Sequence, residues 1–195
     1  MGITLLYADG QTPIDEDEKD GLLIPSINTK KELDEFEQSN IQRAMLRLLG
    51  KRLNKDQVLT EVFILDLHKK MFGGVWQWAG TFRKSNKNLG TDKHFIGIEL
   101  KQLLDDCRFW IEHDTYPPEE MAIRFKHRLV SIHCFPNGNG RHSRLMADVI
   151  IEKIFNADVF SWGGNGCADP RTTYLKALRA ADKNNFESLV LFARS

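Results

Sequence analysis

Apolar residues recur at intervals of three and four along most of the chain, which is the period of helices that bury one face. The pattern predicts helices over residues 29–49, 58–71, 98–113, 119–132, from the glycine-rich segment at 137–140 to about 155, 170–182 and 186–192. Thr29 and Glu32 predict a capping box that opens the first of them. Short β-prone pieces between turn residues predict one exposed hairpin near 81–97. The expected fold class is therefore all-α, a helical bundle with a small β-hairpin.

Length and charge narrow the classes of protein that fit. The chain has 195 residues, and its 27 Lys and Arg balance its 27 Asp and Glu. One domain over residues 29–195 is expected, after a lead-in segment of residues 1–28. The zero net charge argues against direct nucleic-acid binding. No stretch approaches the ~20 apolar residues of a membrane span and no signal peptide is recognisable, so we expect a cytoplasmic protein without membrane contact.

Two further features are expected to carry no chemistry. The acidic run at residues 15–20 has the composition of a solvent-exposed segment. The cysteines Cys107, Cys134 and Cys167 are far apart and form no CxxC pair, which fits a reducing compartment and excludes a zinc or dithiol motif.

The segment His133–Arg144, between two predicted helices, has the composition of a phosphate site. Gly138, Asn139 and Gly140 stand where a helix begins, so backbone N–H groups can approach an anion at the positive end of the helix dipole. Arg141 and Arg144 are three residues apart and share a helix face, and two guanidinium groups beside such a loop indicate a polyphosphate.

His133 ends the helix before this loop. An imidazole with a near-neutral pKa can take a proton from an incoming hydroxyl while the loop holds the phosphates. The combination indicates phosphoryl or nucleotidyl transfer. Phe135, between polar neighbours, is interpreted as the core anchor of the loop, and Cys134 as a packed thiol.

The same residues resemble the Fic signature, commonly written HxFx(D/E)GNGRxxR. Trp78, Ala79 and Gly80, followed by Arg83, resemble the WAGxxR segment that precedes the flap hairpin of that family. Residues 174–178 resemble its C-terminal helix, so the resemblance covers most of 29–193. Within the family, the chain most resembles the stand-alone group called mobile mystery protein B.

The resemblance implies a Fic fold that transfers AMP from ATP to a Tyr, Thr or Ser hydroxyl of a target protein bound along the flap. It implies that His133 is the general base, that Gly138, Asn139 and Gly140 hold the inner phosphates, and that Arg141 and Arg144 hold the outer ones. Glycine at position 140 favours AMP transfer over the phosphorylation of the Doc branch, which carries lysine there. A small helix-turn-helix companion protein, with a toxin-like role for this chain, is the genetic context that the subgroup implies.

Position 137 departs from the family pattern. Asn137 replaces the acidic residue that helps to hold Mg²⁺, and an amide oxygen is a weaker ligand for that ion. ATP with Mg²⁺ held chiefly by the phosphates is expected. Two alternatives stay open: a catalytically weakened module that binds nucleotide or a partner, and an enzyme with another phosphate-containing donor.

Many Fic proteins are inhibited by a glutamate within (S/T)xxxE(G/N), which this chain lacks in its usual form. Glu37, on the first long helix, is the best candidate for an equivalent, and we expect it to pair with Arg144. Tyr174 and Leu178 are weaker candidates for a nucleoside pocket, because apolar residues at helical spacing more often belong to a core.

Overall fold

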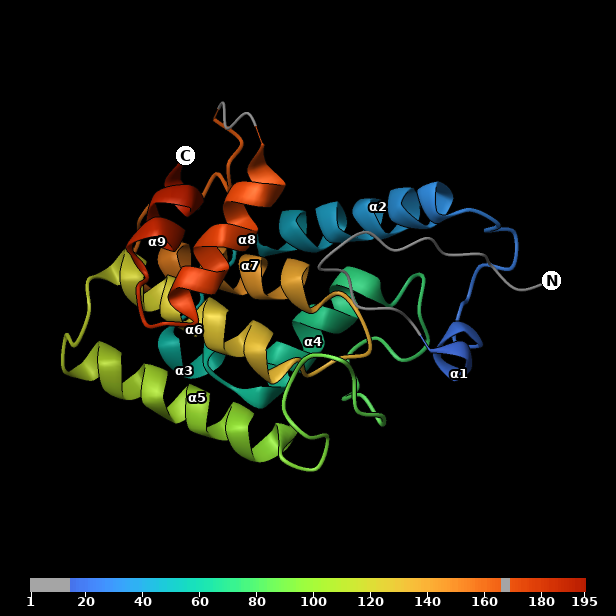
Figure 1. Ribbon diagram of the computed structural model, residues 1–195, viewed down its shortest axis with the longest axis horizontal. Coiled ribbons are helices and arrows are strands. Elements are labelled where there is room, and N and C mark those ends of the chain that lie inside the picture. The colour runs from blue at the N-terminus through green and yellow to red at the C-terminus, as the bar shows by residue number, and fades with distance from the viewer. Residues whose placement is uncertain (1–14, 166–168) are drawn as a thin grey trace.

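The computed structural model describes residues 15–165 and 169–195, which fold into a bundle of helices (Figure 1). In chain order these are α1 (Glu16–Lys19), α2 (Lys30–Leu48), α3 (Lys55–Val58), α4 (Glu61–Phe72), α5 (Ile96–Glu112), α6 (Pro118–Ile132), α7 (Asn139–Val149), η1 (Ile150–Ile154), α8 (Pro170–Ala181) and α9 (Glu187–Arg194). Over the described residues, β structure is limited to an isolated antiparallel bridge between Leu22 and Trp76. The all-α fold class is confirmed. None of the described helices is long and apolar enough to cross a membrane.

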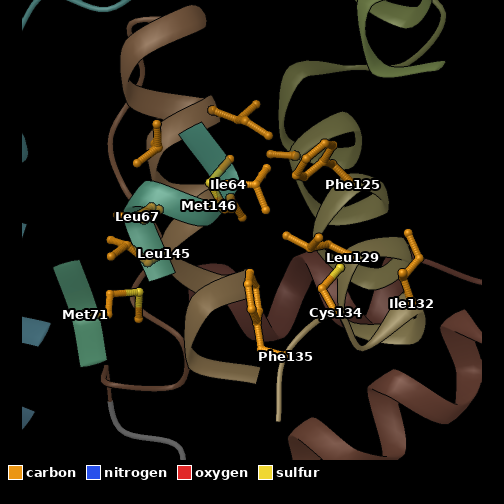
Figure 2. Packing of buried hydrophobic residues seen from close by; sticks show 14 of the residues in the cluster. Ile64, Leu67, Met71, Phe125, Leu129, Ile132, Cys134, Phe135, Leu145 and Met146 are labelled. Atoms are coloured by element: carbon orange, nitrogen blue, oxygen red, sulfur yellow. The ribbon is translucent and has the colours of Figure 1, made fainter. Parts of the chain in front are cut away.

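The core forms where α6 packs against α5, α7 and α9, while α4 connects α2 to α7. Figure 2 shows apolar side chains of α4, α6 and α7 pointing toward one another, with Phe135 projecting into the same cluster from the loop after α6. Phe125, Met146 and Phe135 are completely buried. Each such side chain contributes roughly 1.5–3 kcal/mol by leaving water, so the loop that carries the candidate site is anchored in the core.

Helix starts follow the local rules, with one difference from prediction. The Thr29 hydroxyl accepts from the Glu32 N–H at 3.2 Å and the Glu32 carboxylate accepts from the Thr29 N–H at 3.0 Å, so the capping box is confirmed. The helix predicted over 58–71 begins later, as α4 at Glu61, because Val58 instead ends the short helix α3, which was not predicted. Thr60 causes the break, because its hydroxyl accepts from the Phe63 N–H at 3.1 Å and starts a new helix.

The predicted hairpin near 81–97 does not form; this stretch consists of turns and bends up to the start of α5. The Arg83 guanidinium donates to the carbonyls of Ser85, at 2.8 Å, and Thr91. Its backbone N–H donates to the Cys134 carbonyl at 2.9 Å. These contacts occupy backbone groups that paired strands would use, so the stretch is an irregular loop held against the end of α6.

Residues 15–28 pack against the body of the fold. The Leu23 N–H donates to the Val75 carbonyl at 2.8 Å. Glu18 is 9% exposed and accepts from the Lys87 ammonium at 2.5 Å. The expectation that the acidic run is fully solvent-exposed is therefore wrong at Glu18, because a buried lysine partners its carboxylate. Cys167 lies outside the described residues.

Candidate active site

His133 is fixed by the end of α6. It caps this helix in the left-handed conformation, with φ 58° and ψ 59°, and is 6% exposed. Its carbonyl accepts from Arg83 Nε at 2.6 Å, and its ring donates to the Val130 carbonyl. Since one ring nitrogen donates its proton, the other carries the lone pair of a neutral imidazole.

The surroundings keep this imidazole neutral. Burial and, to a smaller extent, the positive charges of Arg83 and Lys87 together lower the pKa of His133 to about 4, against the Val130 hydrogen bond. At neutral pH the ring is therefore a proton acceptor. The expected general base thus has the protonation state that the role requires.

The loop after His133 is closed by a side chain. Asn139 accepts from the Phe135 N–H at 3.0 Å and donates to the Phe135 carbonyl at 2.8 Å. Phe135 is the core anchor predicted from the sequence, and its ring stacks on His68 with centroids 3.7 Å apart. The side-chain amide of Asn139 is therefore used to shape the loop. Only the backbone N–H of this residue is left to contact an anion.

The two glycines of the loop have different surroundings. Gly138, the N-cap of α7, has φ 79°, and a Cβ there would lie 2.6 Å from Phe72. Gly140 differs: no atom of the described residues lies within 4 Å of a Cβ built on it. The Gly138 N–H donates to Asn137 Oδ1 at 2.7 Å. The backbone N–H at the start of α7 thus faces a space that can hold an oxygen acceptor, since Asn137 Oδ1 already occupies it.

Glu37 approaches the signature from α2, but its partner differs from the expected one. The Glu37 carboxylate pairs with Arg141 at 2.5 Å and accepts from Trp76 Nε1 at 2.6 Å. The Glu37 side chain is 3% exposed. The expected contact with Arg144 is replaced by one with Arg141, because α2 packs along α4 and Arg141 is the arginine that lies over the Phe72 ring of α4.

The Arg144 side chain lies against α8, a different helix from the one that Arg141 lies against. Its guanidinium lies 5.8 Å from the ring centroid of Tyr174 on α8, whereas that of Arg141 lies 4.8 Å from the Phe72 ring on α4. The two arginines are thus in separate surroundings. Tyr174 accepts from the buried Lys126 at 2.5 Å, so the candidate nucleoside residue is engaged with the core.

Comparison with known proteins identifies the family. The sequence profile of the Fic/DOC family matches residues 58–151, which hold α4, the Arg83 loop and the signature. This chain carries a Fic/DOC family domain. The protein adenylyltransferase Fic of Aedes aegypti is 28% identical over an alignment of 126 positions, which covers 62% of this chain and 25% of that protein. The match thus spans about a quarter of that relative.

Solved Fic structures share the fold. Fic-1 of C. elegans, residues 134–508, aligns with a TM-score of 0.68 and 21% identity over 90% of this chain and 51% of that one. The BepC effector of Bartonella tribocorum, a structure with bound AMPPNP, aligns with a TM-score of 0.69 and 15% identity over 92% and 97%. At these identities the likeness establishes the Fic fold.

The expected metal ligand, the Asn137 amide oxygen, already has neighbours in the structure. Among the described residues there is no group of three or more His, Cys, Asp or Glu placed to hold one. The Asn137 amide oxygen accepts from Gly138 and lies 3.4 Å from Arg141, while Glu37 is paired with a cation. Burial raises the pKa of the Cys134 thiol to about 12, so Cys134 is a packed thiol, as expected.

Two residues of the Fic site were not predicted as such. Trp76 donates a hydrogen bond to the Glu37 carboxylate, and the His68 ring on α4 contacts the Asn137 carbonyl of the loop. The signal for His68 is its place on the apolar face of α4, four residues before Phe72 and four after Ile64. A histidine at such a position needs hydrogen-bond partners in the core. Which partners it finds is not encoded locally.

Proposed function

We propose that this Fic chain transfers AMP from ATP to a hydroxyl side chain of a target protein. The observation that carries the proposal is the neutral imidazole of His133, held directly before the loop that opens α7. His133 takes the proton of the hydroxyl, whose oxygen forms a bond to the α-phosphorus. The bond from that phosphorus to the bridging oxygen breaks, and pyrophosphate leaves.

The proposed phosphate contacts come from the start of α7. The backbone N–H groups of residues 138–140 face the inner phosphates, and Arg141 and Arg144 balance the charge of the outer ones. Magnesium, when bound, neutralises phosphate charge; Asn137 Oδ1 is the oxygen that this loop offers it, so the ion depends chiefly on the nucleotide.

The target is proposed to lie along the loop of residues 84–92. Gly90 comes so close to the base that a Cβ there would lie 2.5 Å from His133 Cβ. A Tyr, Thr or Ser hydroxyl presented along this loop therefore reaches the imidazole. The loop contains no strand before the target binds, so pairing with an extended segment of the target requires it to rearrange.

Glu37 is proposed to inhibit the enzyme through Arg141. A carboxylate that is 3% exposed and accepts from both Trp76 and Arg141 holds the guanidinium in a charge-assisted hydrogen bond. Phosphate oxygens must compete with it for the same donors. Removal of Glu37 is therefore expected to release Arg141 for the nucleotide.

The direct test is intact-mass measurement of automodification in ATP with Mg²⁺ or Mn²⁺. One added AMP that is lost in His133→Ala supports transfer, and Glu37→Gly should raise the rate about tenfold, as loss of a competing charge-assisted bond implies. Glu35→Gly is the matched control, because it places glycine in the same helix at an exposed side chain. Equal rates in both variants would exclude inhibition by Glu37.

A second candidate function follows from Asn137. An amide in place of the usual carboxylate fits a module that binds nucleotide or a partner without transfer, or that uses another donor. Asn137→Asp separates these: a rate that rises with Mg²⁺ indicates a weakened transferase. If ATP binds to both forms and neither forms an adduct with any nucleoside triphosphate, the binding module is the better interpretation.

A further inference from the structure

His68 joins two segments that are far apart in the sequence. Its ring lies on α4 and has no exposed surface. Nδ1 lies 3.0 Å from the Gly80 backbone nitrogen, and Nε2 lies 3.1 Å from the Asn137 carbonyl oxygen. One imidazole thus bridges the segment before Arg83 and the signature loop.

The two partners determine which nitrogen carries the proton. A backbone N–H can only donate, so Nδ1 accepts from Gly80 with its lone pair. A carbonyl can only accept, so Nε2 holds the hydrogen and donates it to Asn137. Burial keeps the pKa of His68 well below its ordinary value, which agrees with this neutral form. A second proton would remove the acceptor that Gly80 needs.

The hydrogen bond to Asn137 also determines the direction of the next donor. The peptide bond between Asn137 and Gly138 is planar and trans, so its N–H points away from its C=O. With the carbonyl directed at His68, the Gly138 N–H faces the opposite side. There it meets Asn137 Oδ1 at 2.7 Å, and that oxygen lies 3.4 Å from Arg141 Nη2.

We infer that His68 is a positioning residue that aims the Gly138 N–H at the phosphate site. The inference rests on the proposed nucleotide-binding function of the loop, and it adds a residue of α4 to the residues that form the site. Phe135 supports the arrangement by stacking on His68 with an interplanar angle of 17°, which holds the plane of the imidazole ring. Phe72, one turn further along α4, closes the space beneath Gly138.

Two single substitutions separate the two hydrogen bonds. In His68→Gln the side-chain amide can reach the Nε2 position and donate to Asn137, whereas in His68→Asn the carbonyl can replace Nδ1 and accept from Gly80. Calorimetry with AMPPNP and with adenosine measures each effect. We expect the Asn variant to bind AMPPNP about tenfold more weakly than the Gln variant, with adenosine affinity unchanged.

His142→Gln is the control for loss of a buried imidazole at the same place. The His142 ring packs beside His68 and Phe135, with centroids 5.4 and 5.1 Å away, but its Nε2 contacts the Ile64 carbonyl at 3.1 Å and neither Gly80 nor Asn137. Equal losses of AMPPNP affinity in His68→Gln and His68→Asn, or losses shared with adenosine, would overturn the inference. A kcat and KM comparison in automodification should place the loss of the Asn variant in the KM for ATP.

A second readout needs no nucleotide. Imidazole nitrogen resonances should identify His68 as the Nε2–H tautomer, and the Gly138 amide resonance should move further in His68→Asn than in His142→Gln. The Nδ1–H tautomer, or an unmoved Gly138 resonance, would refute the positioning role. Absence of AMPPNP binding in the native sequence would instead count against the proposed function, so the two failures are distinguishable.

Discussion

Gly138 and Gly140 lie two residues apart, yet only the first is required by the fold. Gly138 combines φ 79° with the Phe72 ring 2.6 Å from the site of a Cβ. Left-handed backbone costs a residue with a Cβ about 1–2 kcal/mol, and Phe72 must also move. Gly140 lies in the first turn of α7, where no atom of residues 15–165 or 169–195 would crowd a Cβ. Its lack of a side chain leaves room for a ligand.

The contrast gives a matched pair of substitutions. Gly138→Ala should lower the free energy of unfolding by about 2 kcal/mol or more, because strain and the clash with Phe72 add. Gly140→Ala should change it by less than about 0.5 kcal/mol, because alanine fits a helical position. Urea denaturation of both variants checks this. Equal free energies of unfolding for the two variants would show that the loop does not need the left-handed conformation of Gly138.

At the scale of elements, one lysine links two segments: residues 15–28 before α2 and the loop of residues 84–92 after Arg83. The Lys87 side chain is 3% exposed, and its ammonium pairs with Asp15 at 2.6 Å and with Glu18 at 2.5 Å. The hydrogen bond from Lys87 lowers the pKa of Asp15 below its ordinary range. A buried ammonium between two carboxylates holds both elements in place, since removal leaves Glu18 buried without its partner.

Lys87→Met should therefore release both elements. We expect faster amide exchange over residues 15–28 and 84–92 and a loss of about 2–3 kcal/mol in the stability of this region, with the helices of the core unaffected. Lys101→Met is the control, because its pair with Asp105 is 77% and 49% exposed and is worth less than about 1 kcal/mol. Unchanged exchange in Lys87→Met would show that backbone contacts suffice.

The whole molecule is expected to lose stability in acid. Burial holds the pKa of His133 at about 4, that of His142 at about 3 and that of His68 well below its ordinary value. Below about pH 6.5 the unfolded chain binds these protons and the folded one does not, so stability falls as pH decreases. Asp148 has the opposite effect and offsets one histidine. Burial raises its pKa to about 7, so in this pH range the folded state holds a proton on Asp148 that the unfolded state releases.

Three histidines less Asp148 leave the unfolded state with about two more protons than the folded state between pH 4.5 and 6.5. The free energy of unfolding should therefore fall by about 1.4 kcal/mol per proton for each pH unit of acidification. Urea unfolding at several pH values measures it. His142→Gln should reduce the slope by one proton, because glutamine can donate to Ile64 without titrating. A native slope near zero, or one that the substitution leaves unchanged, would contradict the assignment.

The sequence alone determined the features that depend on neighbours along the chain. Helix positions followed from apolar spacing because each helix must bury one face. The predicted bounds lie within two residues of the structure, except that the helix predicted from 58 begins at Glu61. The candidate base, glycines and arginines fall within twelve consecutive positions, so their order around the start of α7 was readable. Asn137 was visible as a departure for the same reason.

Only the tertiary structure decided which distant groups meet. Glu37 and Arg141 are 104 residues apart, and the packing of α2 along α4 selected Arg141 over Arg144 as the partner. His68 found Asn137 across 69 residues, and Arg83 bound loop carbonyls that the β-prone pattern had assigned to a hairpin. Such choices depend on the burial of polar groups, since a donor or acceptor removed from water must take whatever partner the assembled core supplies.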